Sequence, residues 1–595
     1  MKKPKNFQEG IHTADFWDFY KEKLIQDSVI ADFSREKISL NGDWKYGIDQ
    51  YDTCLRNRWW SEHEYDGGGR ALPLDYSFDE WESVEIPCCW NLQSEKLFLY
   101  EGGMVYTRKF TTPPISPLEE GGVNERVFIK FGGVSGRAAV FVNKAFMGLH
   151  EGSSTPFCVE VTDVLQPENR ILVAVNNTRR ADGVPMDNTD WFNYGGIYRD
   201  VELIRLPEVF IKAFHAGFKA GNIFARVSVD GAESGTAVLR IRELGIEAEF
   251  DIKNGVSVPA SPELWDVDNP KLYDVEIEFG GDKISDKIGF REISVQGREI
   301  LLNGRSIFLR GISAHEESVK NGKAVTEEEI RENYALAKEM NCNFMRLAHY
   351  PHSEAAARIA DEVGILLWEE IPVYWAIEFH NPETYDNAEN QLTELITRDI
   401  NRASVVVWSV GNENPDTDSR FEFMGRLADK AREIDGTRPI TAACLVDHGT
   451  LRIADRLIEK LDIIGINEYY GWYDPDFSKP PKVFENSSPE KPVIISEFGA
   501  DCKAGFTQKR GTRDDMFSEE FQLDVYKKQI ETLSAIEYIK GISPWIFYDF
   551  RCPRRLHYMQ DYYNIKGLLS ADKKYKKKAF YAMQKFYEKK EKDAL

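Results

Sequence analysis

Two glutamates in this sequence stand where a run of strand-like residues ends. Glu413 follows residues 405–412, and Glu497 follows residues 493–496. Two carboxyl groups that face one another across a cleft can cleave a glycosidic bond, because one protonates the leaving oxygen while the other attacks the anomeric carbon. The two roles require different pKa values, which unequal surroundings provide. One such glutamate could equally be a helix cap or an ion-pair partner, but two in patterned contexts favour catalysis.

The elements that must position these carboxyl groups lie after about residue 296, where strand-length apolar runs alternate with amphipathic stretches. Eight βα units in about 300 residues predict a (β/α)8 TIM barrel. Glu413 and Glu497 follow the fourth and seventh predicted strands, so they can face each other across the barrel mouth. The eight predicted strands are 306–313, 342–349, 365–371, 405–412, 440–445, 462–469, 492–498 and 541–549.

Helical stretches follow most of these strands. Thr326, with Glu329 three residues later, forms a capping-box pattern that predicts a helix start. Because the chemistry of such barrels lies at the carboxyl ends of the strands, polar and aromatic side chains there are candidate site residues. The other predicted helices are 353–363, 386–401, 418–434, 516–535 and 575–590. The polar strand ends are 311–315, 346–350, 368–370, 408–413, 467–469, 496–499 and 544–550.

The N-terminal half of the chain is rich in short strand-like runs. Residues 1–206 contain apolar runs separated by glycine-rich turns, which predicts a β-sandwich of the jelly-roll type. Residues 207–295 contain shorter alternating runs, and their length predicts a small immunoglobulin-like β-sandwich. We therefore expect three domains, with the catalytic barrel at residues 296–595.

The charge of the chain excludes several kinds of partner. With 98 acidic and 75 basic side chains the net charge is −23, whereas nucleic-acid and anionic-lipid surfaces require a basic footprint. A small anionic ligand would need a local positive group that overrides this field. We expect no nucleic acid and no membrane as partners.

No cofactor or metal site is expected from the motifs. The sequence has no Cys-x-x-Cys pair, no HExxH motif and no glycine-rich phosphate loop. The eight cysteines are scattered, which predicts buried free thiols in a reducing compartment. No apolar segment follows the basic N-terminus, so we expect no signal peptide and a cytoplasmic location.

Two motifs resemble those of glycoside hydrolase family 2. Residues 408–415 (WSVGNENP) resemble the acid/base motif of that family, and residues 496–499 (SEFG) resemble its nucleophile motif. The predicted sandwiches are similar to its sugar-binding and linker domains, so the resemblance covers nearly the whole chain. It implies a retaining exo-β-glycosidase with Glu413 as acid/base and Glu497 as nucleophile.

Within that family, three segments resemble bacterial β-glucuronidases: 467–473, 497–505 and 564–567. The resemblance implies that Asn564 and Lys566 hold the C6 carboxylate of a uronic acid, because an ammonium group gives a carboxylate charge-assisted hydrogen bonds. The alternative is that Lys566 belongs to the solvated basic stretch at residues 573–578.

The resemblance also assigns the other site residues. Asn412 would bind the sugar 2-OH, Tyr469 would bind the nucleophile, and Arg346 would keep Glu497 ionised through its charge. For His315 and Trp472, packing is nearly as consistent as contact with the sugar. The remaining implied substrate-binding residues are Asp190, His315, His349, Trp472, Tyr473, Trp545, Asn564 and Lys566.

The sequence departs from the glucuronidase pattern in two places. Some glucuronidases have an arginine four residues before the asparagine of Asn-x-Lys-Gly, but this chain has Gln560; Arg554 or Arg555 could substitute for it. The segment 376–387 after the third strand is short where several glucuronidases have a long covering loop, which predicts an open mouth that accepts larger aglycones or oligosaccharide ends.

Three other functions remain open at this point. A β-galacturonidase would use Lys566 equally well, and a β-galactosidase would share the chemistry but not need the charge. A catalytically silent carbohydrate-binding protein is the alternative from another class. The family resemblance also implies a homo-oligomer, either a dimer or a tetramer.

Overall fold

The computed structural model describes residues 16–112, apart from 63, 64, 66, 67, 73 and 75, together with 125–507 and 515–594. We expect no signal peptide at the N-terminus, and most of that segment lies outside the described residues. The chain forms two compact units. The first comprises Met1–Ile30, Arg35–Thr178 and Asn193–Glu208, and the second comprises Ala31–Ser34, Arg179–Phe192 and Val209–Leu595.

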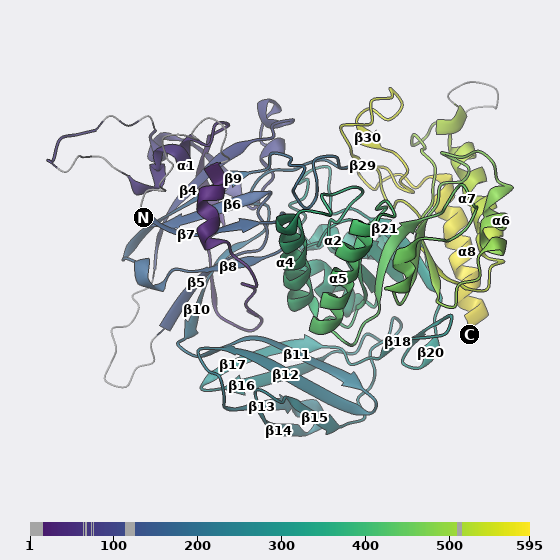
Figure 1. Cartoon of the computed structure of the whole chain (residues 1–595), viewed down its shortest axis with the longest axis horizontal. Coiled ribbons are helices and arrows are strands. Elements are labelled where there is room, and N and C mark those ends of the chain that lie inside the picture. Colours follow the sequence, from purple (N-terminus) through teal and green to yellow (C-terminus); the bar gives the residue numbers. More distant parts are fainter. Residues whose placement is uncertain are drawn as a thin grey trace. The chain divides into compact units, whose positions relative to one another are not determined.

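The first unit is an antiparallel β-sandwich, as predicted for the jelly-roll domain (Figure 1). A six-stranded sheet has the order β3-β2-β4-β9-β6-β7, and a four-stranded sheet has the order β1-β10-β5-β8. The strands are β1 (Lys37–Ser39), β2 (Gly42–Ile48), β3 (Glu82–Ile86), β4 (Gly103–Thr111), β5 (Glu125–Phe131), β6 (Arg137–Val142), β7 (Ala145–Glu151), β8 (Phe157–Glu160), β9 (Glu168–Asn176) and β10 (Val201–Pro207).

Strand β6 shows how alternating side chains build this unit. Ala138, Val140 and Val142 join the core between the two sheets. Ala139 and Phe141 point the other way, into a second apolar cluster that contains Trp17 of the 3-10 helix Phe16–Lys23. Because successive side chains of a strand lie on opposite faces, an apolar strand such as β6 can serve two cores at once.

The second unit contains an immunoglobulin-like sandwich of two antiparallel sheets, β11-β12-β15 and β14-β13-β16-β17. Alternate residues of β16 are buried, in keeping with one face on the core and one toward solvent. The strands are β11 (Phe210–Lys219), β12 (Asn222–Asp230), β13 (Thr236–Ile241), β14 (Ile246–Asp251), β15 (Val256–Pro259), β16 (Tyr273–Phe279) and β17 (Asp282–Ile288). A small sheet of β18 (Ile293–Gln296), β19 (Glu299–Leu302) and β20 (Arg305–Ser306) follows in the chain.

The rest of the second unit is a closed barrel of eight parallel strands in chain order, as predicted. All eight predicted strands are present, and six of them differ from the prediction at their ends. They are β21 (Leu309–Ala314), β22 (Phe344–Leu347), β23 (Leu366–Glu370), β24 (Val405–Asn412), β25 (Ile440–Leu445), β26 (Ile464–Asn467), β27 (Val493–Glu497) and β28 (Ile539–Ile542). The predicted multidomain fold class is therefore confirmed; its boundaries at 206/207 and 295/296 stay predictions.

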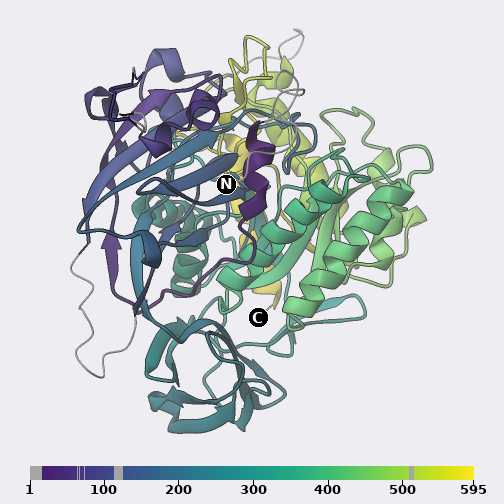
Figure 2. The same cartoon turned by 60° about the vertical axis from the view of Figure 1, so that its left-hand side comes forward.

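Helices lie outside the barrel strands, and α4 packs beside α5 as α7 does beside α8 (Figures 1 and 2). Helix α2 begins with the predicted capping box, in which the Thr326 side chain and the Glu329 carboxylate exchange hydrogen bonds with each other's backbone N–H. The helices are α2 (Glu327–Glu339), α3 (Glu354–Val363), α4 (Pro382–Asp399), α5 (Asp418–Ile434), α6 (Lys479–Asn486), α7 (Glu519–Leu533) and α8 (Lys578–Ala594).

The barrel strands are buried on both faces, as parallel strands covered by helices must be. In β23, Leu366 and Trp368 point into the barrel, while Leu367 packs in the layer under the helices. All eight cysteines are buried free thiols. Among the described residues, no helix has the length and apolar character needed to cross a membrane.

Candidate active site

A cavity of about 370 Å3 lies at the carboxyl ends of the barrel strands. Side chains from strand ends and from the loops that follow them form its wall, together with one residue of the segment 179–192. The lining residues are Asp190, His349, Tyr374, Trp375, Glu413, Leu445, His448, Asn467, Glu468, Tyr469, Tyr473, Asp474, Glu497, Trp545, Arg554, Arg555, Asn564 and Lys566.

Glu413 directly follows β24 and keeps some exposure to the cavity. Each of its carboxyl oxygens accepts one hydrogen bond, Oε1 from Asn467 Nδ2 at 3.0 Å and Oε2 from Trp375 Nε1 at 2.9 Å. Desolvation in the cavity, and then the charge of Glu497, raise the pKa of Glu413 to about 7. A carboxyl with this pKa can hold a proton near neutral pH and give it away, as a general acid must.

Glu497 is the last residue of β27, and it is 4% exposed. Its Oε1 accepts a hydrogen bond from Arg346 Nη1 at 2.6 Å, and its Oε2 accepts one from the Tyr469 hydroxyl at 2.6 Å. A guanidinium and a hydroxyl therefore both donate to this carboxylate. The two glutamates thus sit in unequal surroundings, which suits an acid and a nucleophile.

Arg346 lies behind the cavity wall and links several site residues. It is completely buried, forms a salt bridge with Glu370 at 2.9 Å, and donates to Asn412 Oδ1 at 2.7 Å. Burial alone would raise the pKa of Glu370. The charge of Arg346 and the hydrogen bond from His349 outweigh burial and lower this pKa to about 2. The ion pair therefore holds Arg346 in place for Glu497, while Asn412 lies behind the wall rather than on it.

Lys566 supplies a buried cation to the cavity. It is 1% exposed, forms an ion pair with Asp501 at 2.6 Å, and lies 3.3 Å from the Tyr473 hydroxyl. Burial opposes its charge, but the carboxylate of Asp501 outweighs burial and raises the pKa of Lys566. Gln560 donates to the other oxygen of Asp501. Gln560, at the position where the sequence departs from the glucuronidase pattern, thus helps to hold Asp501 next to Lys566.

Asp190 faces two arginines in the cavity wall. Arg555 forms a close ion pair with Asp190, and Arg554 Nε lies 3.7 Å from Asp190 Oδ1. Asn564 Nδ2 donates to Asp190 Oδ2 at 3.3 Å, and Arg555 Nη1 donates to the Tyr473 hydroxyl at 3.4 Å. Asp190, Arg555, Tyr473 and Lys566 therefore form one hydrogen-bonded chain along the cavity.

His349 and Trp545 form an aromatic part of the wall, with stacked rings whose centroids are 4.8 Å apart. His315 and Trp472 lie behind the wall. His315 packs against Trp545 and Phe550, and burial holds the pKa of His315 well below its ordinary value. Trp472 packs against Phe517, with the Lys566 ammonium 5.1 Å from its ring. Both positions fit the packing alternative.

Several lining residues lie outside the predicted site. Trp375, at φ 53°, is among them and contacts Glu413 directly. It lies in the loop after the third strand, five residues beyond the strand end, where no spacing marks it. The others are Tyr374, Leu445, His448 and Asp474, which no spacing marks, and Glu468, which lies in the predicted polar strand end 467–469. Asn467 belonged to a predicted polar strand end but had no assigned role.

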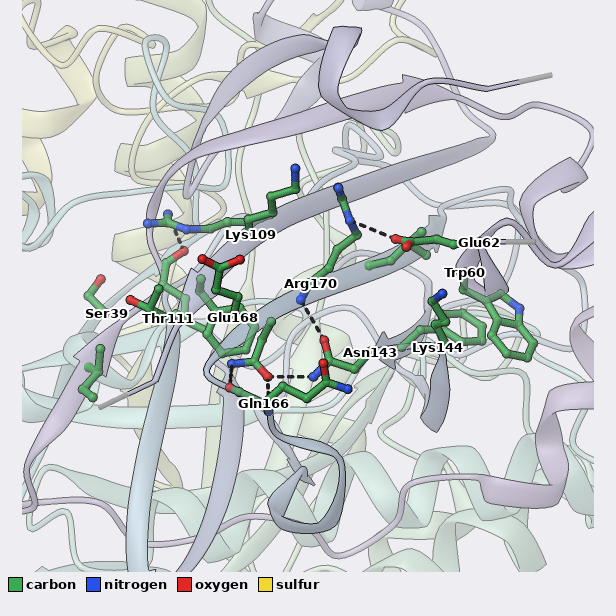
Figure 3. Close-up of a pocket in the computed structure, with 17 residues that line it drawn as sticks. Ser39, Trp60, Glu62, Lys109, Thr111, Asn143, Lys144, Gln166, Glu168 and Arg170 are labelled. Atoms are coloured by element: carbon green, nitrogen blue, oxygen red, sulfur yellow. Dashed lines mark hydrogen bonds and ion pairs between the residues drawn. The ribbon is translucent and has the colours of Figure 1, made fainter. Parts of the chain in front are cut away.

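A larger cavity, of about 860 Å3, lies within the sandwich unit (Figure 3). Its polar side chains bond mainly to one another: Arg170 pairs with Glu62 at 3.0 Å, and Asn143 donates to Asn169 at 2.6 Å. These contacts support the strand ends. In the part of the chain that the structure describes, no group of three or more His, Cys, Asp or Glu side chains is arranged to hold a metal ion.

Comparison with protein families agrees with this architecture. Residues 293–590 match the TIM barrel domain of glycosyl hydrolases family 2, and residues 38–207 match the sugar binding domain of that family. Residues 221–291 match a third model of the same family. The chain belongs to glycosyl hydrolases family 2. It is therefore an enzyme that acts on glycosides, and the family resemblance predicted from the two motifs is confirmed.

Relatives within family 2 carry two activities by name. A β-glucuronidase from Streptococcus agalactiae is 27% identical, over 91% of this chain and 94% of that protein. A β-galactosidase from Thermoanaerobacterium thermosulfurigenes is 29% identical over 66% of this chain and 59% of that protein. The β-glucuronidase of Ruminococcus gnavus, solved with a C6-substituted uronic isofagomine, has a TM-score of 0.82 at 25% identity and covers 95% of this chain and 100% of its own.

Proposed function

We propose that this family 2 enzyme is a retaining exo-β-glycosidase that hydrolyses β-D-glucuronides. The observation that carries the proposal is the buried Lys566 in the same cavity as Glu413 and Glu497. A buried ammonium is costly unless it has partners, and a site for a neutral sugar has no use for it. The named activity of the Streptococcus relative and the uronic ligand of the Ruminococcus structure support the same substrate class.

In the proposed reaction, Glu413 donates its proton to the glycosidic oxygen while the carboxylate of Glu497 attacks the anomeric carbon. The bond to the leaving group breaks and a covalent glycosyl-enzyme forms. Glu413, now ionised, takes a proton from water, which attacks the same carbon and releases the sugar with its β configuration and Glu497 free. Arg346 and Tyr469 would hold Glu497 for both attacks.

The part of the wall that contains Lys566 and Asn564 would hold the uronate. Lys566 and Asn564 would bind its C6 carboxylate, and the hydrogen-bonded Tyr473 would link this group to Arg555. Lys566 and Arg555 lie along this wall, and each already has an acidic partner, Asp501 for Lys566 and Asp190 for Arg555. The substrate carboxylate would add a third acidic group to this chain of alternating charges.

Two other sugars compete with the glucuronide. A β-D-galacturonide has the same carboxylate and differs only at C4, so Lys566 would serve it equally. A β-D-galactoside lacks the carboxylate, and the Thermoanaerobacterium relative carries that activity by name. Comparison of all three sugars on one leaving group separates these candidates.

The test is kcat/KM on p-nitrophenyl β-D-glucuronide, galacturonide and galactoside for wild type and Lys566→Gln. The glutamine keeps a donor for Asp501 but removes the charge. We expect wild type to prefer the glucuronide. We expect Lys566→Gln to lose ~10- to 100-fold on it, because a charge-assisted hydrogen bond contributes about 1.5–3 kcal/mol.

Lys574→Ala is the matched control, because Lys574 is exposed and belongs to the basic stretch at residues 573–578. It should leave all three rates unchanged. A wild type that prefers the galactoside, or a Lys566→Gln enzyme that keeps its sugar preference, would contradict the uronate proposal. Glu413→Gln tests the silent-binder alternative, since any turnover that it abolishes identifies the protein as a catalyst.

A further inference from the structure

Trp375 forms three hydrogen bonds with residues 412–414, the segment at the end of β24 that contains Glu413. Its side-chain Nε1 donates to Glu413 Oε2 at 2.9 Å. Its backbone N–H donates to the carbonyl of Asn412 at 2.9 Å, and its own carbonyl accepts from Asn414 Nδ2 at 2.6 Å. The residues before and after Glu413 thus hold the backbone of the residue that contacts the Glu413 carboxyl.

Both residues of this contact have unusual backbone conformations. Trp375 has φ 53° and Glu413 has φ 52°, in the left-handed region that residues with a side chain rarely adopt. Such conformations persist only where surrounding contacts hold them. Tyr374 and Asn412, which directly precede Trp375 and Glu413, form a parallel β-bridge that supplies such contacts. The chain therefore maintains two strained residues to bring the indole to the carboxyl.

The indole is also held on its faces. The Tyr374 ring stacks on it with centroids 4.5 Å apart, and the Arg554 guanidinium lies 4.9 Å from its ring. Arg554 is fixed in turn, since its Nη1 donates to Asn188 Oδ1 at 3.1 Å. A planar group with contacts on its faces and a hydrogen bond at its edge has little freedom to turn.

We propose that Trp375 is a positioning residue for the acid/base, which orients the Glu413 carboxyl toward the glycosidic oxygen and forms the adjoining wall for the leaving group. This inference rests on the proposed glycosidase function of Glu413. With Asn467 Nδ2 on Oε1 and the indole on Oε2, the carboxyl plane is fixed from both sides. Without the indole, the carboxyl keeps one of its two donors and can rotate away from the bond to be broken.

The test compares two leaving groups on Trp375→Phe, which keeps a ring between Tyr374 and Arg554 but has no N–H. A methyl β-glycoside requires protonation to leave, whereas 2,4-dinitrophenolate leaves without it. General acid catalysis contributes about 10²–10⁴-fold, so misplacing the acid should cost a part of that. We expect kcat/KM to fall at least ~10-fold on the methyl glycoside and to stay within about twofold on the dinitrophenyl glycoside.

A pH profile gives a second readout. The Trp375 N–H lowers the pKa of Glu413, so its loss should move the alkaline limb of kcat/KM to higher pH. Phe379→Leu is the control, because Phe379 lies in the same loop but packs on Phe423. It should change thermal stability without changing the leaving-group ratio or the pH limb.

An equal loss on both leaving groups, with an unmoved pH limb, would overturn the inference and assign Trp375 a purely structural role. The experiment uses whichever β-glycoside the wild type hydrolyses. A wild type that hydrolyses no glucuronide contradicts the proposed substrate, while the leaving-group comparison on another sugar still decides the role of Trp375.

Discussion

At the scale of single residues, Glu413 and Glu497 show how surroundings divide one chemistry between two identical side chains. Glu497 has an arginine and a tyrosine hydroxyl as donors. Glu413 has only the neutral N–H groups of Asn467 and Trp375, and it faces the charge of Glu497. Burial and the charge of Glu497 outweigh the groups that lower the pKa of Glu413, so Glu413 can keep a proton.

The pKa of about 7 for Glu413 predicts the alkaline limb of the activity. Because the carboxyl must be protonated to release the leaving group, kcat/KM should fall as pH rises through about 7, and then about tenfold per pH unit. The measurement is kcat/KM between pH 5 and 9 on a glycoside whose leaving group needs protonation. Glu413→Gln should remove the limb together with most of the rate, and a wild-type profile that stays flat to pH 9 would contradict the assignment.

At the scale of elements, the sequence predicts what is periodic and misses what is not. Strands β24 and β25 and helix α5 have the predicted bounds. The eighth strand ends at Ile542 rather than residue 549, shortly before Pro544, which has no N–H for a ladder. The prediction also starts α4 four residues too late, because it overlooks Asn381, whose side chain caps the helix at Glu383 N.

The same distinction separates the site residues. Glu413, Glu497 and Tyr469 follow apolar runs, so their place at strand ends could be predicted. Trp375 and Arg555 come from loops without a repeating pattern, and only the folded chain shows that one contacts Glu413 and the other Asp190. Loop positions depend on contacts between segments that are far apart in the sequence, which no local spacing encodes.

Two adjacent glutamates of strand β23 point to opposite sides of the barrel wall, and the outward one leads to a prediction about how stability depends on pH. Glu370 points into the barrel and pairs with Arg346, whereas Glu369 points outward to Asp399 of α4. Burial, and then the charge of Asp399, raise the pKa of Glu369 well above its ordinary value. At pH values between the unfolded and the folded pKa of Glu369, folding takes up a proton. The free energy of unfolding therefore falls as pH rises through this range.

Glu369→Gln should remove that loss, because a neutral amide replaces the proton-dependent carboxyl next to Asp399. The difference in Tm between variant and wild type should become more positive from pH 5 to pH 8; each unit of raised pKa corresponds to about 1.4 kcal/mol. Glu422→Gln, at an exposed position of α5, is the control and should show no such trend. A difference in Tm that is the same at both pH values would refute the raised pKa of Glu369 as a source of pH-dependent stability.

At the scale of the whole molecule, a protein of net charge −23 is proposed to bind an anionic sugar. The local cations Lys566, Arg554 and Arg555 line the cavity, but the overall field repels an anion that approaches from solution. These two effects differ in range, since the cations act over contact distances while the net charge acts over the Debye length. The predicted homo-oligomer would combine the charges of several chains and strengthen the long-range effect.

Salt should therefore increase the activity on an anionic substrate. The Debye length falls from about 30 Å at 0.01 M to about 8 Å at 0.15 M, which screens the distant acidic groups more than the cations in the cavity. We expect kcat/KM on p-nitrophenyl β-D-glucuronide to rise ~2- to 5-fold over this range through a lower KM. The neutral galactoside, measured on the same enzyme, should show no such rise. A fall with salt would instead mean that the cations around the cavity dominate the approach of the substrate, and that the net charge of the chain has no part in its capture.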